Sequence, residues 1–143
     1  MSPLVVDASV VAKWYFDEPG CEEARAFLAA ALAAGQPVVA PDLLAIEMAN
    51  LAWKKARRGE VSAEQASAIC RSVPEVVGAL LPSAPLLPAA LDAALELGHP
   101  VYDCLYLAAA EVEEGELVTA DRRLLGATAG TPWAARVRCL GAA

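Results

Sequence analysis

Short apolar runs alternate with longer Ala- and Leu-rich segments along this chain, and the alternation restricts the folds open to it. The runs have the length of buried strands, whereas the segments between them have the length and composition of helices. Strands separated by helices pair in parallel and form a sheet with helices on both faces. We therefore predict an α/β fold, a three-layer α/β/α sandwich with a mainly parallel central sheet. The predicted strands are residues 4–7, 38–40, 76–81, 116–119 and 137–140.

Capping residues and glycines define the ends of the predicted helices. Ser62 and Gln65 have the spacing of a capping box, and Asp42 precedes a long segment that Gly59 ends. We expect Ser62 and Asp42 to cap helices with their side chains. Pro100 fits the first turn of another helix, where its missing N–H leaves no hydrogen bond unmade. The predicted helices are residues 21–34, 43–59, 86–97 and 100–114, with others that begin at Ser9, Ser62 and Arg122.

The bulk composition predicts one domain, residues 1–143, because 57% of the residues are hydrophobic and the chain is long enough to bury a core. No apolar stretch has the length of a membrane span, and the N-terminus lacks the basic region of a signal peptide. We therefore expect a soluble, cytoplasmic protein with no membrane partner. The net charge of −7 argues against a broad basic surface for nucleic acid, unless a metal site holds part of that charge.

Four acidic residues lie inside otherwise apolar segments: Asp7, Glu47, Asp103 and Asp121. A carboxylate buried without a partner costs several kcal/mol or more, so each of these acids needs a counter-charge. Lys13 is close in sequence to Asp7 alone, whereas a bound divalent cation would neutralise all four acids. The single histidine and the absence of a Cys-x-x-Cys pair argue against zinc, and carboxylates suit Mg²⁺ or Mn²⁺.

Each acid also has an ordinary structural explanation. Asp7 and Asp121 follow predicted strands at positions typical of helix N-caps, and Asp103 falls in a first helical turn, where the helix dipole favours an acid. Glu47 is harder to explain, because it interrupts an apolar helical face. The carboxyl ends of parallel strands are also where ligands bind in such sheets. The joint occurrence of the four acids favours a metal cluster over four separate explanations.

Polar and basic residues near the acids are candidates for supporting roles. Ser9 is expected to orient Asp7 or a bound water, and Asn50 shares a helical face with Glu47. His99 is interpreted as an ordinary helix-entry residue. The basic candidates either form solvated helix ends or hold a phosphate backbone, and they are Lys54, Arg57, Arg58 and Arg122.

The segments around the four acids resemble the four motifs of PIN domains, and in particular those of the VapC toxins. The resemblance covers nearly the whole chain, with each acid in its expected element. One departure is that some members carry a further acid shortly after the fourth, whereas Arg122 follows Asp121 here, which leaves the retention of a second metal open. The matching segments are Val5–Trp14, Pro41–Asn50, Val101–Ala108 and Thr119–Leu124.

The resemblance implies an endoribonuclease that depends on one or two Mg²⁺ or Mn²⁺ ions and acts as the toxin of a toxin–antitoxin pair. RNA would be hydrolysed by in-line attack of water on phosphorus. The resemblance also implies a homodimer and a small cognate antitoxin that covers the active site. The residues that match the catalytic, metal-binding acids are Asp7, Glu47, Asp103 and Asp121, and those that match the supporting polar positions are Ser9, Asn50 and Thr119.

Three other functions remain open from the sequence. A phosphotransfer domain with Asp7 as nucleophile explains the acid after the first strand but not Glu47, and Ser9 stands where such domains usually carry a second acid. A non-catalytic metal- or RNA-binding module would share the fold, and an RNA-processing nuclease would lack an antitoxin. Carboxylate ligands by themselves do not separate RNA from DNA, so the preference for RNA rests on the resemblance.

Overall fold

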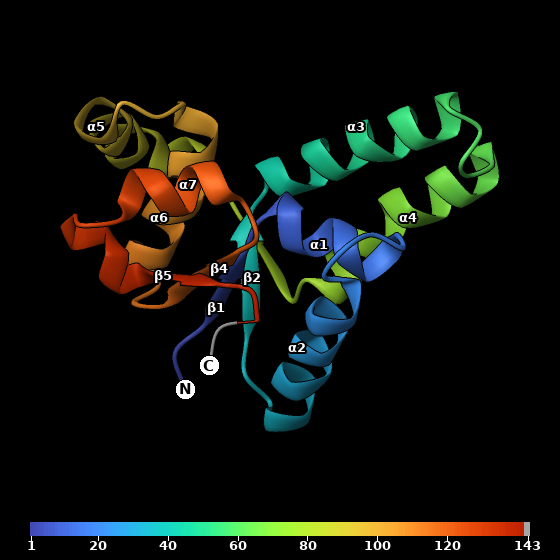
Figure 1. The fold of residues 1–143 in the computed structure, drawn as a ribbon, viewed down its shortest axis with the longest axis horizontal. Coiled ribbons are helices and arrows are strands. Elements are labelled where there is room, and N and C mark those ends of the chain that lie inside the picture. The colour runs from blue at the N-terminus through green and yellow to red at the C-terminus, as the bar shows by residue number, and fades with distance from the viewer. Residues whose placement is uncertain (142–143) are drawn as a thin grey trace.

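The computed structural model describes residues 1–141, and a parallel sheet of five strands lies at its centre (Figure 1). The strands are β1 (Leu4–Val6), β2 (Val38–Pro41), β3 (Ala79–Leu81), β4 (Glu116–Thr119) and β5 (Val137–Cys139). Their order is β3-β2-β1-β4-β5, and every neighbouring pair is parallel. All residues of β1 and β2 are buried, as expected for strands that helices cover on both faces. The predicted α/β sandwich with a parallel sheet is confirmed.

Helices lie on both sides of this sheet. In Figure 1, α5, α6 and α7 lie to the left of the strands, and α1 and α2 lie to the right. Helices α3 and α4 pack against each other as a hairpin that extends away from the sheet. The helices are α1 (Ala8–Tyr15), α2 (Cys21–Ala34), α3 (Leu43–Arg57), α4 (Ala63–Val76), α5 (Leu87–Leu97), α6 (Val101–Val112) and α7 (Arg122–Thr128), with 3₁₀ helices η1 (Ala84–Leu86) and η2 (Pro132–Arg136).

Helix α6 is the most deeply buried helix within residues 1–141. It contacts β1, β2 and β4, and every residue from Cys104 to Ala110 is buried. The small side chains Ala108–Ala110 allow the helix to approach the sheet closely. The start of α6 is therefore fixed next to the carboxyl ends of β1 and β4. None of the helices within residues 1–141 is both long enough and apolar enough to cross a membrane.

The order of the strands reverses between β1 and β4. From β1 the sheet continues to β2 and β3 on one side, whereas β4 and β5 extend it on the other. In open parallel sheets, the crevice at the carboxyl ends of the two strands at such a point is the usual ligand site. Asp7 follows β1 and Asp121 lies two residues after β4, so both acids belong to this edge of the sheet.

A glycine permits β4 to lie beside β1. A Cβ atom at Gly115 would lie 2.3 Å from the carbonyl oxygen of Pro3, so no other residue fits without a backbone shift. The next residue, Glu116, donates its backbone N–H to the same carbonyl oxygen at 3.3 Å. This close approach starts the β1–β4 pairing and sets the register that brings Thr119 near Asp7.

The structure corrects the predicted role of Asp42. This residue occupies the N-cap position of α3, but its side chain makes no capping hydrogen bond. A capping side chain normally extends from a residue with an extended backbone, whereas Asp42 is helical, with φ −64° and ψ −16°. Its Oδ1 instead accepts a hydrogen bond from the backbone N–H of Ser83 at 3.2 Å. The carboxylate therefore ties the start of α3 to the segment that follows β3.

Several predicted boundaries also change. The predicted strand 76–81 begins only at Ala79, because α4 continues to Val76. Val73 and Val77 are both fully buried, and the backbone N–H of Val77 donates to the carbonyl oxygen of Val73 at 3.0 Å, which continues the helical hydrogen-bond pattern to this point. Helix α3 ends two residues before Gly59, and Pro100 stands at the N-cap position of α6 rather than in its first turn.

Candidate active site

Asp7 lies at the carboxyl end of β1 and is 7% exposed. Its Oδ1 accepts hydrogen bonds from Ser9 Oγ at 2.5 Å and from the backbone N–H of Val10 at 3.3 Å. Its Oδ2 accepts a hydrogen bond from Thr119 Oγ1. Burial raises the pKa of Asp7 to about 6, in spite of these hydrogen bonds, which favour the ionised form. Ionised Asp7 therefore lies in an environment that a nearby positive charge would stabilise.

Ser9 and Thr119 connect the ends of β1 and β4. Besides its bond to Asp7, Ser9 Oγ accepts a hydrogen bond from the backbone N–H of Ala120 at 2.9 Å. Thr119 Oγ1 accepts one from the backbone N–H of Asp121 at 3.0 Å, and the two hydroxyl oxygens lie 3.3 Å apart. Both hydroxyls thus hold the Asp7 carboxylate and the segment after β4 in one network, the position that the sequence predicted for supporting residues.

Glu47 projects from α3 and has a partner that the sequence did not predict. The hydroxyl of Tyr106, on α6, donates a hydrogen bond to Glu47 Oε1. Burial raises the pKa of Glu47, with a smaller contribution from the negative charge of Asp103. Burial also raises the pKa of Tyr106, which is 1% exposed, so this hydroxyl stays protonated and can donate. In the sequence, the signal that could have indicated this contact was the position of Tyr106, a residue with a polar hydroxyl, within the apolar run that follows Asp103.

Asp103 lies in the first turn of α6 and is partly exposed. His99 Nε2 and Asp103 Oδ2 are 2.7 Å apart, so the residue interpreted as a plain helix entry contacts a candidate ligand. The charge of Asp103 also raises the pKa of Asp7 and of Glu47. Because charges influence one another strongly only over short distances, the carboxylate of Asp103 lies within electrostatic reach of the other two.

Backbone hydrogen bonds link Asp121 to Thr119 and to the start of α7. It is the N-cap of α7, where its Oδ1 accepts a hydrogen bond from the backbone N–H of Arg123 at 2.9 Å. Its own N–H donates to Thr119 Oγ1. Asp121 is thus held beside the Asp7 network, and its local role as a helix cap is also real.

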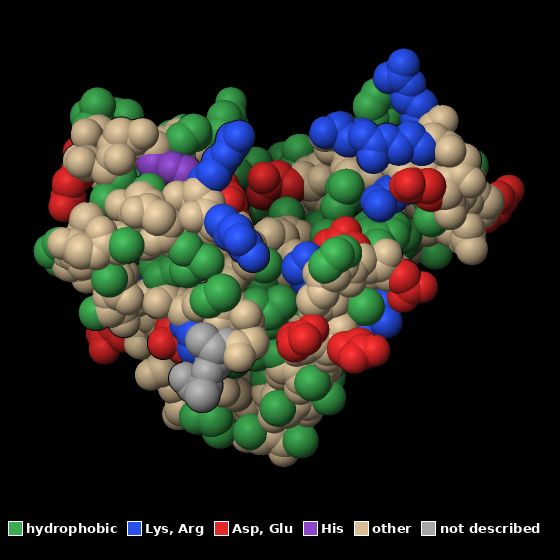
Figure 2. All heavy atoms as spheres, viewed as in Figure 1, with side chains coloured by type: hydrophobic (Ala, Val, Ile, Leu, Met, Phe, Trp, Pro, Cys, Tyr) green, Lys and Arg blue, Asp and Glu red, His purple; other side chains and the backbone are tan. Residues whose placement is uncertain are grey.

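The other predicted residues surround these acids without contacting them. Asn50 is exposed on α3 and makes no hydrogen bond to Glu47 within the described residues, and its supporting role stays a prediction. Figure 2 shows a hollow between the α3 hairpin and the side of the molecule formed by α6 and α7, with acidic side chains inside it and Lys and Arg side chains on both rims. The exposed basic residues on these two elements are Lys54, Arg57 and Arg58 of α3 and Arg122 and Arg123 of α7.

The donor set fits a hard divalent cation. Within residues 1–141, no Lys or Arg forms an ion pair with any of the four acids, and Lys13 pairs instead with Glu18 at 3.1 Å. Three of the acids have one carboxylate oxygen that accepts a protein hydrogen bond and one that accepts none in this range. An oriented carboxylate with a free oxygen is the usual form of a metal ligand. The oxygens without a protein donor are Glu47 Oε2, Asp103 Oδ1 and Asp121 Oδ2.

These acids do not form a closed ligand cage. Among residues 1–141, no group of three or more His, Cys, Asp and Glu side chains is close enough to hold a metal ion by itself. Mg²⁺ usually keeps several waters and binds through only one or two carboxylates together with substrate phosphates. The arrangement therefore suits a cation that is bound partly by water and substrate, rather than a structural ion.

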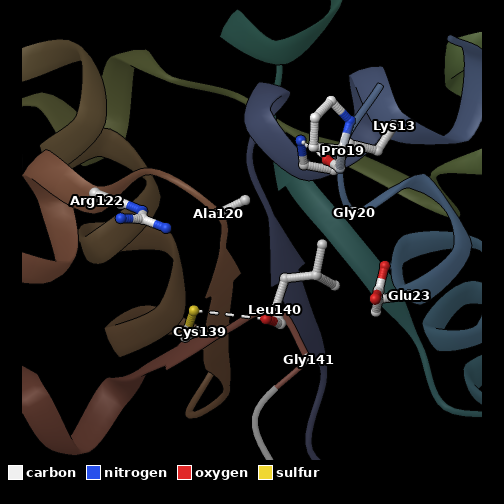
Figure 3. Close-up of a pocket in the computed structure, with 9 residues that line it drawn as sticks. All are labelled: Lys13, Pro19, Gly20, Glu23, Ala120, Arg122, Cys139, Leu140 and Gly141. Atoms are coloured by element: carbon white, nitrogen blue, oxygen red, sulfur yellow. Dashed lines mark hydrogen bonds between the residues drawn. The ribbon is translucent and has the colours of Figure 1, made fainter. Parts of the chain in front are cut away.

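A pocket opens at the carboxyl ends of β4 and β5. Its volume is about 460 Å³, and its lining includes Ala120, Arg122 and Leu140 together with Lys13 and Glu23 from the opposite side. Figure 3 shows Arg122 on one side of this space and Lys13 on the other. Ala120 and Arg122, the sequence neighbours of Asp121, line the pocket, whereas none of the four acids is among its lining residues.

The comparison with family models decides which family this arrangement represents. The model of the PIN domain matches residues 4–129. The chain belongs to the PIN domain family. This confirms the resemblance seen in the four motifs.

Known proteins agree with this assignment. Ribonuclease VapC3 of Pyrobaculum aerophilum is 40% identical over 123 residues, which cover 85% of this chain and 91% of the relative. The crystal structure of PAE2754 from Pyrobaculum aerophilum matches with a TM-score of 0.68 and 29% identity, over 91% of this chain and 82% of that one. A chain of a toxin–antitoxin complex from Klebsiella pneumoniae matches with a TM-score of 0.62 over 94% and 95% of the two chains. At 15% identity, the last match shows the fold alone.

Proposed function

We propose that this PIN-domain protein is a metal-dependent endoribonuclease that acts in the cytoplasm as the toxin of a toxin–antitoxin pair. The observation that carries the proposal is the group of acids around Asp7, which has no Lys or Arg partner within residues 1–141. The 40% identity to a protein named ribonuclease VapC3 supports RNA as the substrate. A shared fold with a chain of a toxin–antitoxin complex supports an antitoxin partner.

The proposed cofactor is Mg²⁺ or Mn²⁺, as one or two ions, with Asp7, Glu47, Asp103 and Asp121 as ligands. When bound, the cation supplies positive charge for the phosphoryl oxygens and favours an ionised water as nucleophile. The four carboxylates hold this charge at the floor of the hollow, where in-line attack of water on phosphorus would take place. Burial, with a smaller contribution from the negative charge of Asp103, raises the pKa of Asp7 and of Glu47, and a cationic occupant would offset both effects.

Three hydroxyl groups are proposed to keep these carboxylates in place. Ser9 and Thr119 hold the two oxygens of Asp7, and Tyr106 holds one oxygen of Glu47. A carboxylate that is already oriented loses little conformational freedom when it binds a cation, so these donors contribute through pre-organisation. Their removal is expected to weaken metal binding rather than to unfold the protein.

The two basic rims are proposed to hold the phosphodiester backbone of the substrate. Lys54, Arg57 and Arg58 are exposed on the last turns of α3, and Arg122 is exposed at the start of α7. Asn50, exposed between the rim and the acids, is a proposed substrate contact. A backbone held from both rims would cross the acids in the hollow, which reconciles RNA binding with a net charge of −7.

The test is cleavage of structured RNAs by the purified, antitoxin-free protein with Mg²⁺ or Mn²⁺, with EDTA as a control. Asp7→Asn is the decisive variant, and Asp92→Asn, an exposed acid on α5, is the matched control. We expect discrete cleavage by the wild type and Asp92→Asn only. Metal binding without cleavage of any RNA would favour a non-catalytic module, and trapping of a phosphorylated Asp7 would favour phosphotransfer.

The proposed partners are an antitoxin and a second copy of the chain. Leu87, Leu91 and Leu95 form an exposed stripe along α5, at 45%, 52% and 75% exposure, which supports self-association. Light scattering after size-exclusion chromatography tests the dimer, and Leu91→Gln is expected to weaken it. Co-purification of a small protein that blocks cleavage tests the toxin role, whereas an active nuclease without such a protein would favour RNA processing.

A further inference from the structure

We propose that His99 is a positioning residue for the metal site, which holds one oxygen of Asp103 and leaves the other for the bound cation. The inference rests on the proposed function, because it assigns a role relative to the cation of that same site. It adds a residue that neither the four motifs nor the order of the acids indicated. His99 lies between α5 and α6, where the sequence suggested only a helix entry.

The contact is short and shielded from water. His99 Nε2 lies 2.7 Å from Asp103 Oδ2, and the histidine side chain is 10% exposed, against 32% for Asp103. Asp103 Oδ1 accepts no hydrogen bond from residues 1–141. The imidazole therefore occupies Oδ2, and the partly exposed carboxylate keeps Oδ1 without a protein donor among the described residues.

Hydrogen bonds to α5 and to α6 fix the backbone of His99. Its N–H donates to the carbonyl oxygen of Ala94 at 3.2 Å, in the last turn of α5. Its carbonyl oxygen accepts the thiol of Cys104 at 3.9 Å, in the first turns of α6. Gly98, with φ +62°, makes the turn that allows this connection. Because two helices anchor the residue, the ring is held against Asp103 before any ligand binds.

Pro100 removes the capping-box role of an acid at the position of Asp103. Asp103 is the third residue of α6, and an acidic side chain there usually reaches back to the N–H of the N-cap residue. The N-cap residue of α6 is Pro100, which has no N–H. Asp103 is therefore not used as a capping group, and His99 is its hydrogen-bond partner within the described chain.

The orientation of Asp103 matters for the whole site. Its charge raises the pKa of both Asp7, which follows β1, and Glu47 of α3, so Asp103 is within electrostatic reach of both carboxylates. A carboxylate free to rotate at this point would have to be ordered when the cation binds. The hydrogen bond from His99 provides that order in advance.

The test is calorimetric titration of the metal-free protein with Mg²⁺, for the wild type, His99→Phe and His99→Gln. His99→Phe keeps a ring but removes the donor, and we expect Mg²⁺ affinity to fall about tenfold to a hundredfold. His99→Gln places an N–H near the same point and should restore affinity to within about threefold. In an Asp103→Asn background, His99→Phe should cause no further loss, because the two residues act through one contact.

The outcomes separate this inference from the proposed function. If the wild type neither binds Mg²⁺ nor cleaves RNA, the proposed function is wrong. If the wild type does both and His99→Phe binds Mg²⁺ equally well, or His99→Gln fails to restore binding, the positioning role is wrong. Should His99→Phe not fold, ¹⁵N–¹H NMR of the wild type decides, because the chain has a single imidazole. We expect a protonated Nε2 whose resonance shifts in Asp103→Asn, and an unprotonated or unchanged Nε2 would refute the inference.

Discussion

The ends of β1 and β4 are alike in local structure but differ in burial. Asp7 and Asp121 each cap the helix that follows and accept a hydrogen bond from a backbone N–H of that helix. Asp7 is almost completely buried, and its pKa is raised to about 6 by that burial, whereas Asp121 is only partly buried. Two residues with the same local role thus have very different electrostatic surroundings.

The difference in burial shows that helix capping alone does not account for Asp7. The capping role alone places no unusual demand on Asp121, because its partly exposed carboxylate remains solvated. At the end of β1, a Ser, Thr or Asn side chain would cap α1 equally well and would avoid the cost of a buried charge. The negative charge of Asp7 therefore has a use that capping does not require, and cation binding is that use in the proposed function.

The largest expected effect is on cleavage. Asp7→Asn should lower the single-turnover rate of RNA cleavage about a thousandfold or more, because it removes the most deeply buried charge that faces the cation. Asp121→Asn keeps the cap of α7 and should lower the rate only about tenfold. Measurement of both variants at saturating Mg²⁺ checks the ranking. Equal losses would show that burial does not distinguish the two acids in catalysis.

A second prediction concerns stability in EDTA. Since the folded pKa of Asp7, about 6, exceeds its ordinary value of 3.8, the native state binds more protons than the unfolded state between these values. This contribution to stability is present below about pH 4 and is lost as pH rises through 6, by about 3 kcal/mol in total. Asp7→Asn should abolish this part of the pH dependence and be more stable than wild type at pH 8.

Urea denaturation at several pH values tests this prediction, with Asp121→Asn as the matched control. The control should follow the wild-type profile within about 0.5 kcal/mol. A wild type that is as stable at pH 8 as Asp7→Asn would mean that the buried carboxylate is already compensated within the protein.

A third prediction concerns the hydroxyl that links the two strand ends. Thr119→Val removes the donor to Asp7 Oδ2 and should weaken Mg²⁺ binding about tenfold. Thr128→Val is the control, since Thr128 is equally buried but donates to the carbonyl oxygen of Leu124 at 3.0 Å. Both variants should lose about 1 kcal/mol of stability, but only Thr119→Val should lose Mg²⁺ affinity, as measured by calorimetry. Equal affinities would limit Thr119 to a structural role.

The smallest expected effect is on RNA binding, and it concerns the residue that directly follows each of the two acids. Arg122, directly after Asp121, is exposed beside the pocket, whereas Ala8 follows Asp7. Arg122→Gln should raise KM several-fold with little change in kcat and reduce the slope of log affinity against log salt by about 0.7. Arg25→Gln, in an exposed ion pair on α2, should change neither value. A loss in kcat alone would place Arg122 in the chemical step instead.

Local signals in the sequence predicted the elements and the positions of the acids. The capping box at Ser62 forms as expected, with Gln65 N–H donating to Ser62 Oγ at 3.0 Å. The boundaries of α2 and β4 also agree with the prediction. These features depend on residues close in sequence, so propensity and spacing are sufficient to predict them. The strand prediction for 76–78 was wrong because burial at Val73 and Val77 extends a helix, a property of tertiary packing.

The partners of the acids depended on contacts between distant segments. Tyr106 and Glu47 are separated by 59 residues, and Thr119 and Asp7 by 112. The sequence placed Thr119 near the site only through the family resemblance, and it did not predict the contact of Tyr106. Asn50 and Glu47 share a helical face but form no hydrogen bond within the described residues, because a shared face does not decide which way two side chains turn.

The sequence by itself determined a parallel α/β fold with an acid at the ends of two strands and near the starts of two helices. Apolar periodicity and capping chemistry are local, and they act before the chain is folded. Only the tertiary structure decided that Asp7 is buried, that Tyr106 holds Glu47 and that His99 holds Asp103. Burial and side-chain pairing depend on how the sheet and helices pack, and packing brings together residues whose separation along the chain carries no information about their distance in space.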